Sequence, residues 1–224
     1  MFVPQNCLER KFATLFTAGF SLIELLVVIA IISLLAGLAV PAFNSIGQAR
    51  GAAEAADRIA ASIEFARAEA VSRKTFVWLG IQETTNAGNL ALRLGIVCSA
   101  DGTTNSSPSN LQQLGRPVVV DRVGILPCAQ LDVGTNLSQA VDLAGSPGGL
   151  DFQIGGTRFA SRRTIAFTPL GEVGTNPAPA WPHCFDPVLA IGIRQARGTD
   201  LARNSDIAVA IDGATGFGTI LRKN

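Results

Sequence analysis

The positions of apolar residues divide this 224-residue chain into three stretches. The stretch GFSLIELLVVIAIISLLAGL, residues 19–38, is apolar almost throughout and carries a single charge. Residues 46–70 then repeat small or apolar side chains at spacings of three and four, and after residue 74 short apolar runs alternate with turn residues. This order predicts an α+β fold: one long N-terminal α-helix, residues 20–74, packed on a small antiparallel β-sheet domain, residues 75–224.

The first apolar stretch is long enough to cross a bilayer. No charged residue lies between Glu24 and Arg50, and about 20 apolar helical residues span the hydrocarbon core. We therefore expect the first half of the helix, residues 20–43, to be membrane-spanning. An acid within a span either has a function or lies close enough to headgroup water to be tolerated, and both interpretations apply to Glu24.

The residues before the span do not fit a secretory signal peptide. A signal peptide has its apolar segment before the cleavage site, whereas here the small residue Gly19 precedes the apolar run and Arg10 and Lys11 lie upstream. A cut after Gly19 would remove residues 1–19 as a short basic leader. The helix would then stay on the mature chain, which would begin at Phe20.

The second half of the predicted helix is amphipathic. Its apolar face is predicted to consist of Ile46, Ala49, Ala53, Ala56, Ala60, Ile63, Ala66 and Ala70. On other faces Glu54 is spaced to pair with Arg58, and Glu64 with Arg67. Pro41 lacks a backbone N–H, so it should kink the helix or loosen the preceding turn.

Six runs in the last stretch are rich in β-branched and apolar residues and predict strands. They are residues 75–82, 90–99, 117–126, 164–173, 188–195 and 206–221, the last of which is expected to be a hairpin with DGATG as its turn. Turn-forming residues separate the others, at 83–89, 100–110, 144–149 and 174–183. Short strands in this order indicate antiparallel sheet and not βαβ units.

Charge and candidate chemistry favour a protein without catalysis of its own. The chain has 18 basic and 17 acidic residues, and without Glu9, Arg10 and Lys11 the mature chain is formally neutral, which gives no electrostatic case for nucleic acid. The single histidine, His183, lies beside Cys184, but adjacent side chains on an extended loop point apart and no third metal ligand is near. We expect no enzyme activity, no metal and no cofactor; a membrane-anchored periplasmic enzyme is the alternative that these residues do not favour.

The run Gly19-Phe20-Ser21-Leu22-Ile23-Glu24, followed by a long apolar helix, resembles the leader and N-terminal helix of type IV pilins and pseudopilins. The resemblance implies cleavage after Gly19 by a prepilin peptidase, which also methylates the new N-terminal Phe20. It implies that Glu24 pairs with the N-terminal amine of a neighbouring subunit during assembly, and that Pro41 is the family's helix proline.

Three later segments resemble the GspH/FimT family of minor pilins and pseudopilins: IVCSADG at 96–102, TIAFTPLGEV at 164–173 and DIAVAIDGATGFGTI at 206–220. Membership would imply a single-pass inner-membrane protein with a cytoplasmic N-terminus and a periplasmic domain, later part of a type IV pilus or a type II secretion pseudopilus. Its partners would be the prepilin peptidase, other minor and major pilins or pseudopilins, the inner-membrane assembly platform and membrane lipid. The sequence does not choose between the two machines.

Two further questions stay open at this point. Cys98, Cys128 and Cys184 would lie in an oxidising compartment, where three pairings are available and one thiol must remain. Some relatives bind DNA through a Gly-Arg-x-Arg pattern in the last hairpin, but here residues 216–219 are GFGT. The sequence therefore does not favour the alternative of DNA binding, for which Arg222 and Lys223 are the nearest cations, with Arg158, Arg162 and Arg163 elsewhere in the chain.

Overall fold

The structure, a computed structural model, describes residues 21–104, 107–134, 137, 139–144, 150, 152–154, 157–159, 163–175, 187–202 and 206–222. In the helix, the side chains of residues 38–50 lie outside this description. The chain divides into two compact units, Met1–Asn44 and Ser45–Asn224. The first unit contains the beginning of helix α1, and the second contains the rest of α1 and all the strands.

Helix α1 runs from Leu22 to Arg73 and confirms the predicted helix to within two residues at either end. It ends because Lys74 takes a left-handed conformation, with φ of 53°, and the Thr75 N–H then donates to Ala70 O at 3.2 Å. The backbone is helical through Pro41. The kink expected at this residue stays a prediction.

The buried face of α1 differs in part from the predicted one. The helix residues removed from solvent are Ala52, Ala55, Ala56, Ile59, Ser62, Ile63, Ala66 and Ala70. The predicted Ala53 and Ala60 are only half-buried and lie at the margin of this face. Alanine occupies so many positions here that several stripes fit the same spacing, and the bulky Ile59 and Ile63 determine which of them faces the core.

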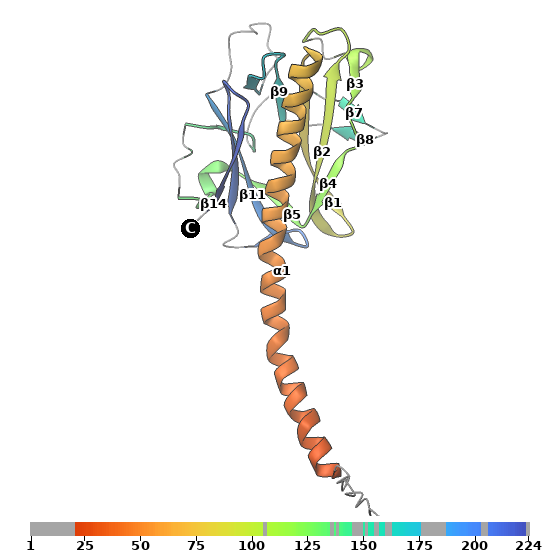
Figure 1. Cartoon of the computed structure of the whole chain (residues 1–224), viewed down its shortest axis with the longest axis vertical. Helices are drawn as coiled ribbons and strands as arrows, with labels where there is room; N and C mark the ends of the chain where they lie inside the picture. The colour runs from red at the N-terminus through yellow and green to blue at the C-terminus, as the bar shows by residue number, and fades with distance from the viewer. Residues whose placement is uncertain are drawn as a thin grey trace, which may run out of the picture. The chain divides into compact units, whose positions relative to one another are not determined.

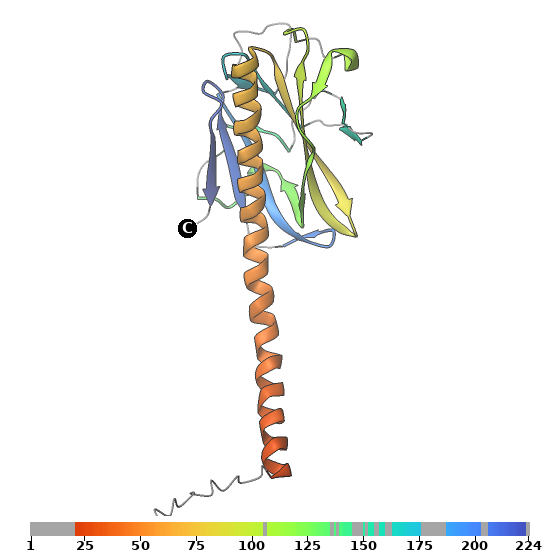
Figure 2. The ribbon, with the colours of Figure 1, turned by 45° about the vertical axis from the view of Figure 1, so that its right-hand side comes forward.

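The second unit contains two six-stranded sheets, and α1 lies across both (Figures 1 and 2). The first sheet has the order β10-β9-β1-β2-β3, with β4 also paired to β2; its strands are β1 (Val77–Asn86), β2 (Asn89–Ser99), β3 (Leu111–Gln113), β4 (Val118–Asp121), β9 (Thr164–Phe167) and β10 (Val173–Gly174). The second has the order β12-β11-β13-β14, with β5 and β6 paired to β11; its strands are β5 (Val123–Leu126), β6 (Val141–Asp142), β11 (Val188–Arg197), β12 (Asp200–Leu201), β13 (Ile207–Asp212) and β14 (Gly218–Arg222).

The remaining elements are small. Strands β7 (Phe152–Ile154) and β8 (Thr157–Phe159) form a hairpin, and single 3-10 turns occupy Pro108–Asn110 and Cys128–Gln130. The α+β class and the antiparallel sheet are confirmed, with one exception: β6 runs parallel to β11. The predicted hairpin at the C-terminus is also confirmed, because β13 pairs with β14 across residues 213–217.

The first sheet is covered on both faces. Its α1-facing residues join the main core with the inner residues of the second sheet, such as Leu189, Ile191 and Val209. On the other face Trp78, Val97 and Ala166 pack against the β7–β8 hairpin. That hairpin brings two stacked rings, Phe152 and Phe159, whose centroids are 5.0 Å apart, against the outer surface of β1 and β2.

Two glycines make room for these rings. Gly80 of β1 lies directly opposite Gly95 of β2. A Cβ on Gly80 would lie 2.6 Å from the ring of Phe152, and a Cβ on Gly95 would lie 2.6 Å from the ring of Phe159. The paired glycines therefore allow the aromatic hairpin to approach the sheet backbone.

The turn predicted at residues 83–89 is wrong in its extent. Strand β1 continues to Asn86, and only Ala87 and Gly88 form the turn, both with positive φ, 48° and 79°. This is the geometry of a type I′ hairpin. The polar end of β1 is held by tertiary contacts, because Glu83 accepts the Ile125 N–H at 2.8 Å and pairs with Arg163 at 2.9 Å.

The single strand predicted at residues 117–126 is two strands in different sheets. β4 pairs with β2, whereas β5 pairs with β11. The change occurs at Arg122, whose φ of 60° is uncommon for a residue with a side chain and turns the backbone from one sheet to the other. The N–H of Arg122 donates to Leu90 O and its carbonyl accepts the Ala196 N–H, both at 2.7 Å.

Candidate functional site

The first turn of α1 is closed by a reciprocal cap. The Glu24 N–H donates to Ser21 Oγ at 3.2 Å, and the Ser21 N–H donates to Glu24 Oε2 at 3.5 Å. The residues Ser21-Leu22-Ile23-Glu24 thus form a capping box, which satisfies two N–H groups that the helix itself leaves open. The S-x-x-E spacing is visible in the sequence, but the prediction for Glu24 considered only its charge.

The helix in the first unit presents apolar side chains on all its sides. Every Leu, Ile and Val from residue 22 to 35 is exposed, and Leu22 is the extreme case at 82%. Among the described residues, no helix combines the length and apolarity needed to cross a membrane, so the membrane span expected over residues 20–43 is not confirmed. Gly19 and Phe20, the predicted processing residues, lie outside the described residues, as does the side chain of Pro41.

Glu64 and Arg67 of α1, which were expected to pair with each other, instead contact the β13–β14 hairpin. The Arg67 Nε donates to Thr215 O at 2.6 Å, and its guanidinium lies over the Phe217 ring at 4.0 Å. Glu64 Oε1 accepts the Gly218 N–H at 3.4 Å. The predicted Glu64–Arg67 interaction on the helix surface is therefore replaced by contacts to the β13–β14 hairpin, which sequence spacing could not reveal.

The cations considered for nucleic acid do not gather at this hairpin in the described part of the chain. Arg222 forms an ion pair with Asp57 at 3.5 Å, and Arg163 pairs with Glu83 at the opposite sheet. Phe217, which stands where related DNA-binding hairpins have arginine, is 53% exposed beneath Arg67. Lys223, Arg162 and the side chain of Arg158 lie outside the described residues.

The structure describes two of the three cysteines that would remain after removal of the leader. Cys98 and Cys128 are buried free thiols. Burial raises the pKa of the Cys98 thiol, and burial together with Asp142 raises the pKa of Cys128 to about 12. In the structure these two thiols are bonded neither to each other nor to another cysteine, and Cys184, with its neighbour His183, lies outside the described residues. In the part of the chain that is described, no group of three His, Cys, Asp or Glu side chains could hold a metal ion.

The loop after β2 contains a network of polar side chains that was not predicted from the sequence. The carboxylate of Asp101 accepts the Thr103 N–H at 2.9 Å and the amide of the buried Asn110 at 2.8 Å. The hydroxyls of Thr103 and Ser99 donate to the same oxygen at 2.7 and 2.8 Å. These donors, led by the Thr103 N–H, hold the pKa of Asp101 below its usual range. The network fixes a loop that has no disulfide partner for Cys98 within residues 103–109.

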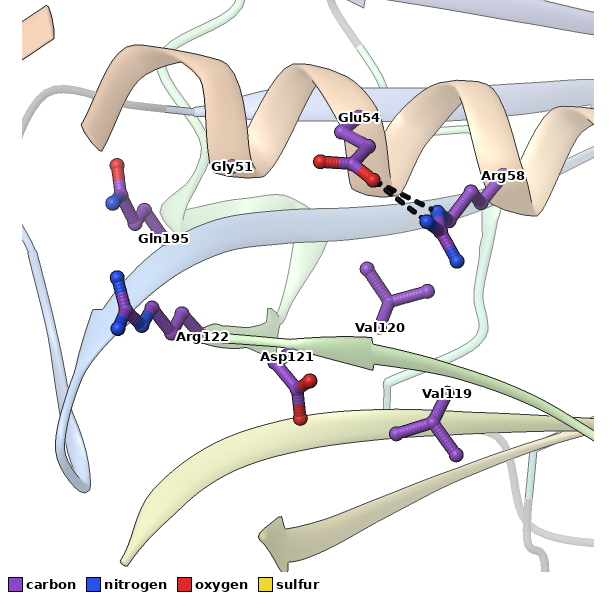
Figure 3. A pocket seen from close by; sticks show the side chains of 8 residues that line it. All are labelled: Gly51, Glu54, Arg58, Val119, Val120, Asp121, Arg122 and Gln195. Atoms are coloured by element: carbon purple, nitrogen blue, oxygen red, sulfur yellow. Dashed lines mark hydrogen bonds and ion pairs between the residues drawn. The ribbon is translucent and has the colours of Figure 1, made fainter. Parts of the chain in front are cut away.

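A groove follows the side of α1 that faces β4, and we call it the α1–β4 groove. Its larger hollow, of about 400 Å³, is lined by Gly51, Glu54, Arg58, Val119, Val120, Asp121, Arg122 and Gln195 (Figure 3). A second hollow of about 300 Å³ shares Arg58 and is lined mainly by apolar side chains, including Phe65, Ile96, Leu114 and Val118, with Arg116 also in its wall. Nothing in the sequence pattern predicted this groove, because its walls come from segments far apart in the chain: α1, residues 114–122, Ile96 and Gln195.

The comparisons with known proteins bear on the N-terminal segment. Residues 17–40 match the family described as the prokaryotic N-terminal methylation motif. Comparison with curated proteins and with solved structures finds no match. The match covers Gly19, Phe20, Glu24 and the exposed apolar part of α1. The chain therefore carries a type IV pilin-like prepilin leader at residues 17–40.

Proposed function

We propose that this chain is a structural subunit of a type IV pilus or type II secretion pseudopilus, a minor pilin or pseudopilin of the GspH/FimT kind. The observation that carries the proposal is the N-terminal methylation motif at residues 17–40. Its cleavage position would be Gly19, and Phe20 would become the methylated N-terminus.

The apolar surface of the first unit supports membrane anchoring before assembly. Side chains from Leu22 to Leu35 are exposed on consecutive positions, so every face of this helix segment needs an apolar environment. Lipid would provide that environment first, with the N-terminus in the cytoplasm and the second unit in the periplasm. Neighbouring subunit helices would provide it after entry into the filament.

The fold of the second unit supports assignment to the GspH/FimT kind. Its three resembling segments become β2 with its loop, the β9–β10 hairpin and the β13–β14 hairpin. In the first sheet β2 and β9 flank β1, and in the second β13 lies between β11 and β14, so all three segments belong to the two sheets that α1 covers. We propose that the domain contacts other minor and major subunits and the assembly platform, and that it has no catalytic activity and needs no cofactor.

The motif predicts a specific processing product. When the full chain is co-expressed with a prepilin peptidase, its intact mass should correspond to loss of residues 1–19 and gain of one methyl group on Phe20. Gly19→Val should block the cut, whereas the matched change Ala39→Val, within the apolar run, should leave it intact. Cleavage after Ala36 or Ala39 would contradict the proposal.

DNA uptake is the alternative from within the same family, and it has a separate test. If the subunit is structural only, the full chain in detergent should retard duplex DNA weakly at physiological salt. Changing Phe217 and Thr219 to Arg should strengthen binding, because the hairpin would gain phosphate contacts. Tight, salt-sensitive binding by the unmodified chain would favour DNA uptake instead.

A further inference from the structure

Strand β4 is an edge strand beside the α1–β4 groove. In the described sheets β4 pairs with β2 alone. Figure 3 shows Val120 pointing toward α1, whereas Val119 and Asp121 point away from it. All three line the larger hollow. Neighbouring side chains in a strand point to opposite faces of the sheet. A hollow lined by side chains from both faces must therefore lie along the edge of the strand.

The register of β4 determines which of its backbone groups are open. The Arg122 N–H donates to Leu90, the residue opposite it, so alternate residues from Arg122 back to Val120 and Val118 face β2. The N–H and C=O groups of Val119 and Asp121 therefore point the other way, along the groove. This is the arrangement that accepts an added strand.

The charges of the groove favour an acidic occupant. Its lining carries three guanidinium groups, of Arg58, Arg116 and Arg122, against the two carboxylates of Glu54 and Asp121. Glu54 pairs with Arg58 at 2.8 Å, and Asp121 accepts the Asn86 amide at 2.8 Å. Arg116 and Arg122 have no side-chain partner among the described residues. They stand at the two ends of β4, separated by at most about 20 Å of extended chain. Two cations thus bracket the open edge of β4, and the apolar hollow lies at the Arg116 end.

We propose that the α1–β4 groove is a docking site for an extended acidic segment of a partner protein, which adds as a strand to the open edge of β4. Val119 and Asp121 exchange backbone hydrogen bonds with the segment. Carboxylates near its two ends meet Arg116 and Arg122, and an apolar side chain enters the hollow between Phe65 and Leu114. The proposal goes beyond the structural role given above and does not depend on entry into a filament.

A labelled peptide tests this with the full chain in detergent. The probe is an eight-residue peptide with glutamate at both ends and alternating valine and threonine between them, and its binding is measured by fluorescence anisotropy. Micromolar binding is expected, and the same peptide with lysine at both ends should bind at least about tenfold more weakly, because it meets Arg116 and Arg122 with like charge. Amide hydrogen exchange at Val119 and Asp121 should slow when the glutamate peptide binds.

Two pairs of variants locate the site. Val119→Pro removes an N–H that is not bonded to β2, so β4 should stay paired with β2 while the affinity for the peptide falls about tenfold. Val119→Ala keeps this N–H and should bind the peptide nearly as well as the unmodified chain. Arg116→Glu should weaken binding by at least a similar factor, whereas Lys74→Glu, a matched charge change at the end of α1, should not. Absence of binding, equal binding of both peptides, or unchanged affinity in both Val119→Pro and Arg116→Glu would overturn the proposal.

Discussion

Ser21 and Glu24 cap the first turn of α1 reciprocally, each donating its backbone N–H to the other's side chain, at 3.5 and 3.2 Å. Glu24 therefore has a role within a single chain, besides the pairing with a neighbour's N-terminal amine that the resemblance to type IV pilins implies for the filament. The two roles can be separated, because Ser21 takes part in the cap alone.

Removing the cap should loosen the helix start without removing the charge. Ser21→Ala should destabilise the first turn by about 1 kcal/mol, because the Glu24 N–H loses its acceptor. Amide exchange in detergent should then be roughly fivefold faster at Glu24 and Leu25, whose N–H groups donate to the Ser21 hydroxyl and carbonyl. Ser21→Thr keeps the hydroxyl and should exchange at nearly the original rate. Unchanged exchange in Ser21→Ala would mean that the cap does not hold the turn.

The paired glycines beneath the aromatic hairpin should tolerate no side chain. Gly95→Ala places a Cβ 2.6 Å from the Phe159 ring, and we expect a loss of about 1–3 kcal/mol in the free energy of unfolding. Gly218→Ala is the control, because its Cβ would meet its nearest neighbour at an ordinary 3.7 Å. Chemical denaturation of both variants measures the difference. Adding Phe159→Leu to Gly95→Ala should recover part of the loss, and equal stability of the two single variants would contradict the packing described.

The Asp101 loop should give the domain a pH dependence in acid. The pKa of Asp101 is lower in the folded chain than in the unfolded chain, where an aspartate has a pKa of about 3.9. Its contribution to stability is therefore present above pH of about 4 and is lost as the pH falls through the folded value. Asp101→Asn should be less stable than the unmodified chain at pH 7, and the difference should shrink progressively below about pH 4. A difference that did not change with pH would contradict this account of the loop.

The thiol of Cys128 should be inert while the protein is folded. Its pKa of about 12 keeps it protonated at pH 8, and its burial excludes reagents. Iodoacetamide should therefore label neither Cys128 nor Cys98 before denaturation. After denaturation both should be labelled equally with and without prior reduction, because both are free thiols. Rapid labelling of the folded chain would contradict the burial of these side chains.

The sequence predicted the elements well where one local pattern dominates. The long apolar run and the 3–4 spacing predict α1 from end to end, and DGATG between two apolar runs predicts the last hairpin. The predictions from sequence were wrong where a tertiary contact determines the backbone conformation. The polar end of β1 continues as a strand, where Glu83 accepts the Ile125 N–H. The apolar run at residues 117–126 divides at Arg122 into two strands that belong to different sheets.

The candidate sites follow the same rule. Gly19, Phe20 and Glu24 belong to a contiguous motif, so the sequence could identify them directly. Arg67 and Phe217 are 150 residues apart in the chain, and only the fold brings the guanidinium over the ring. The groove residues Arg58, Arg116 and Arg122 likewise have no common sequence signature.

The measurement that tests the central claim most directly compares wild-type, Glu24→Ala and Glu24→Gln chains in membranes and in sheared filaments of cells that assemble them. Membrane levels should be equal, because both changes make the helix easier to insert. The amount in sheared filaments should fall for both variants, since a neighbouring amine would enter the filament core without its carboxylate, whereas Ser21→Ala should remain incorporated. Equal incorporation of all four chains would mean that Glu24 only caps its own helix, and absence of the wild-type chain from filaments would contradict its role as a filament subunit.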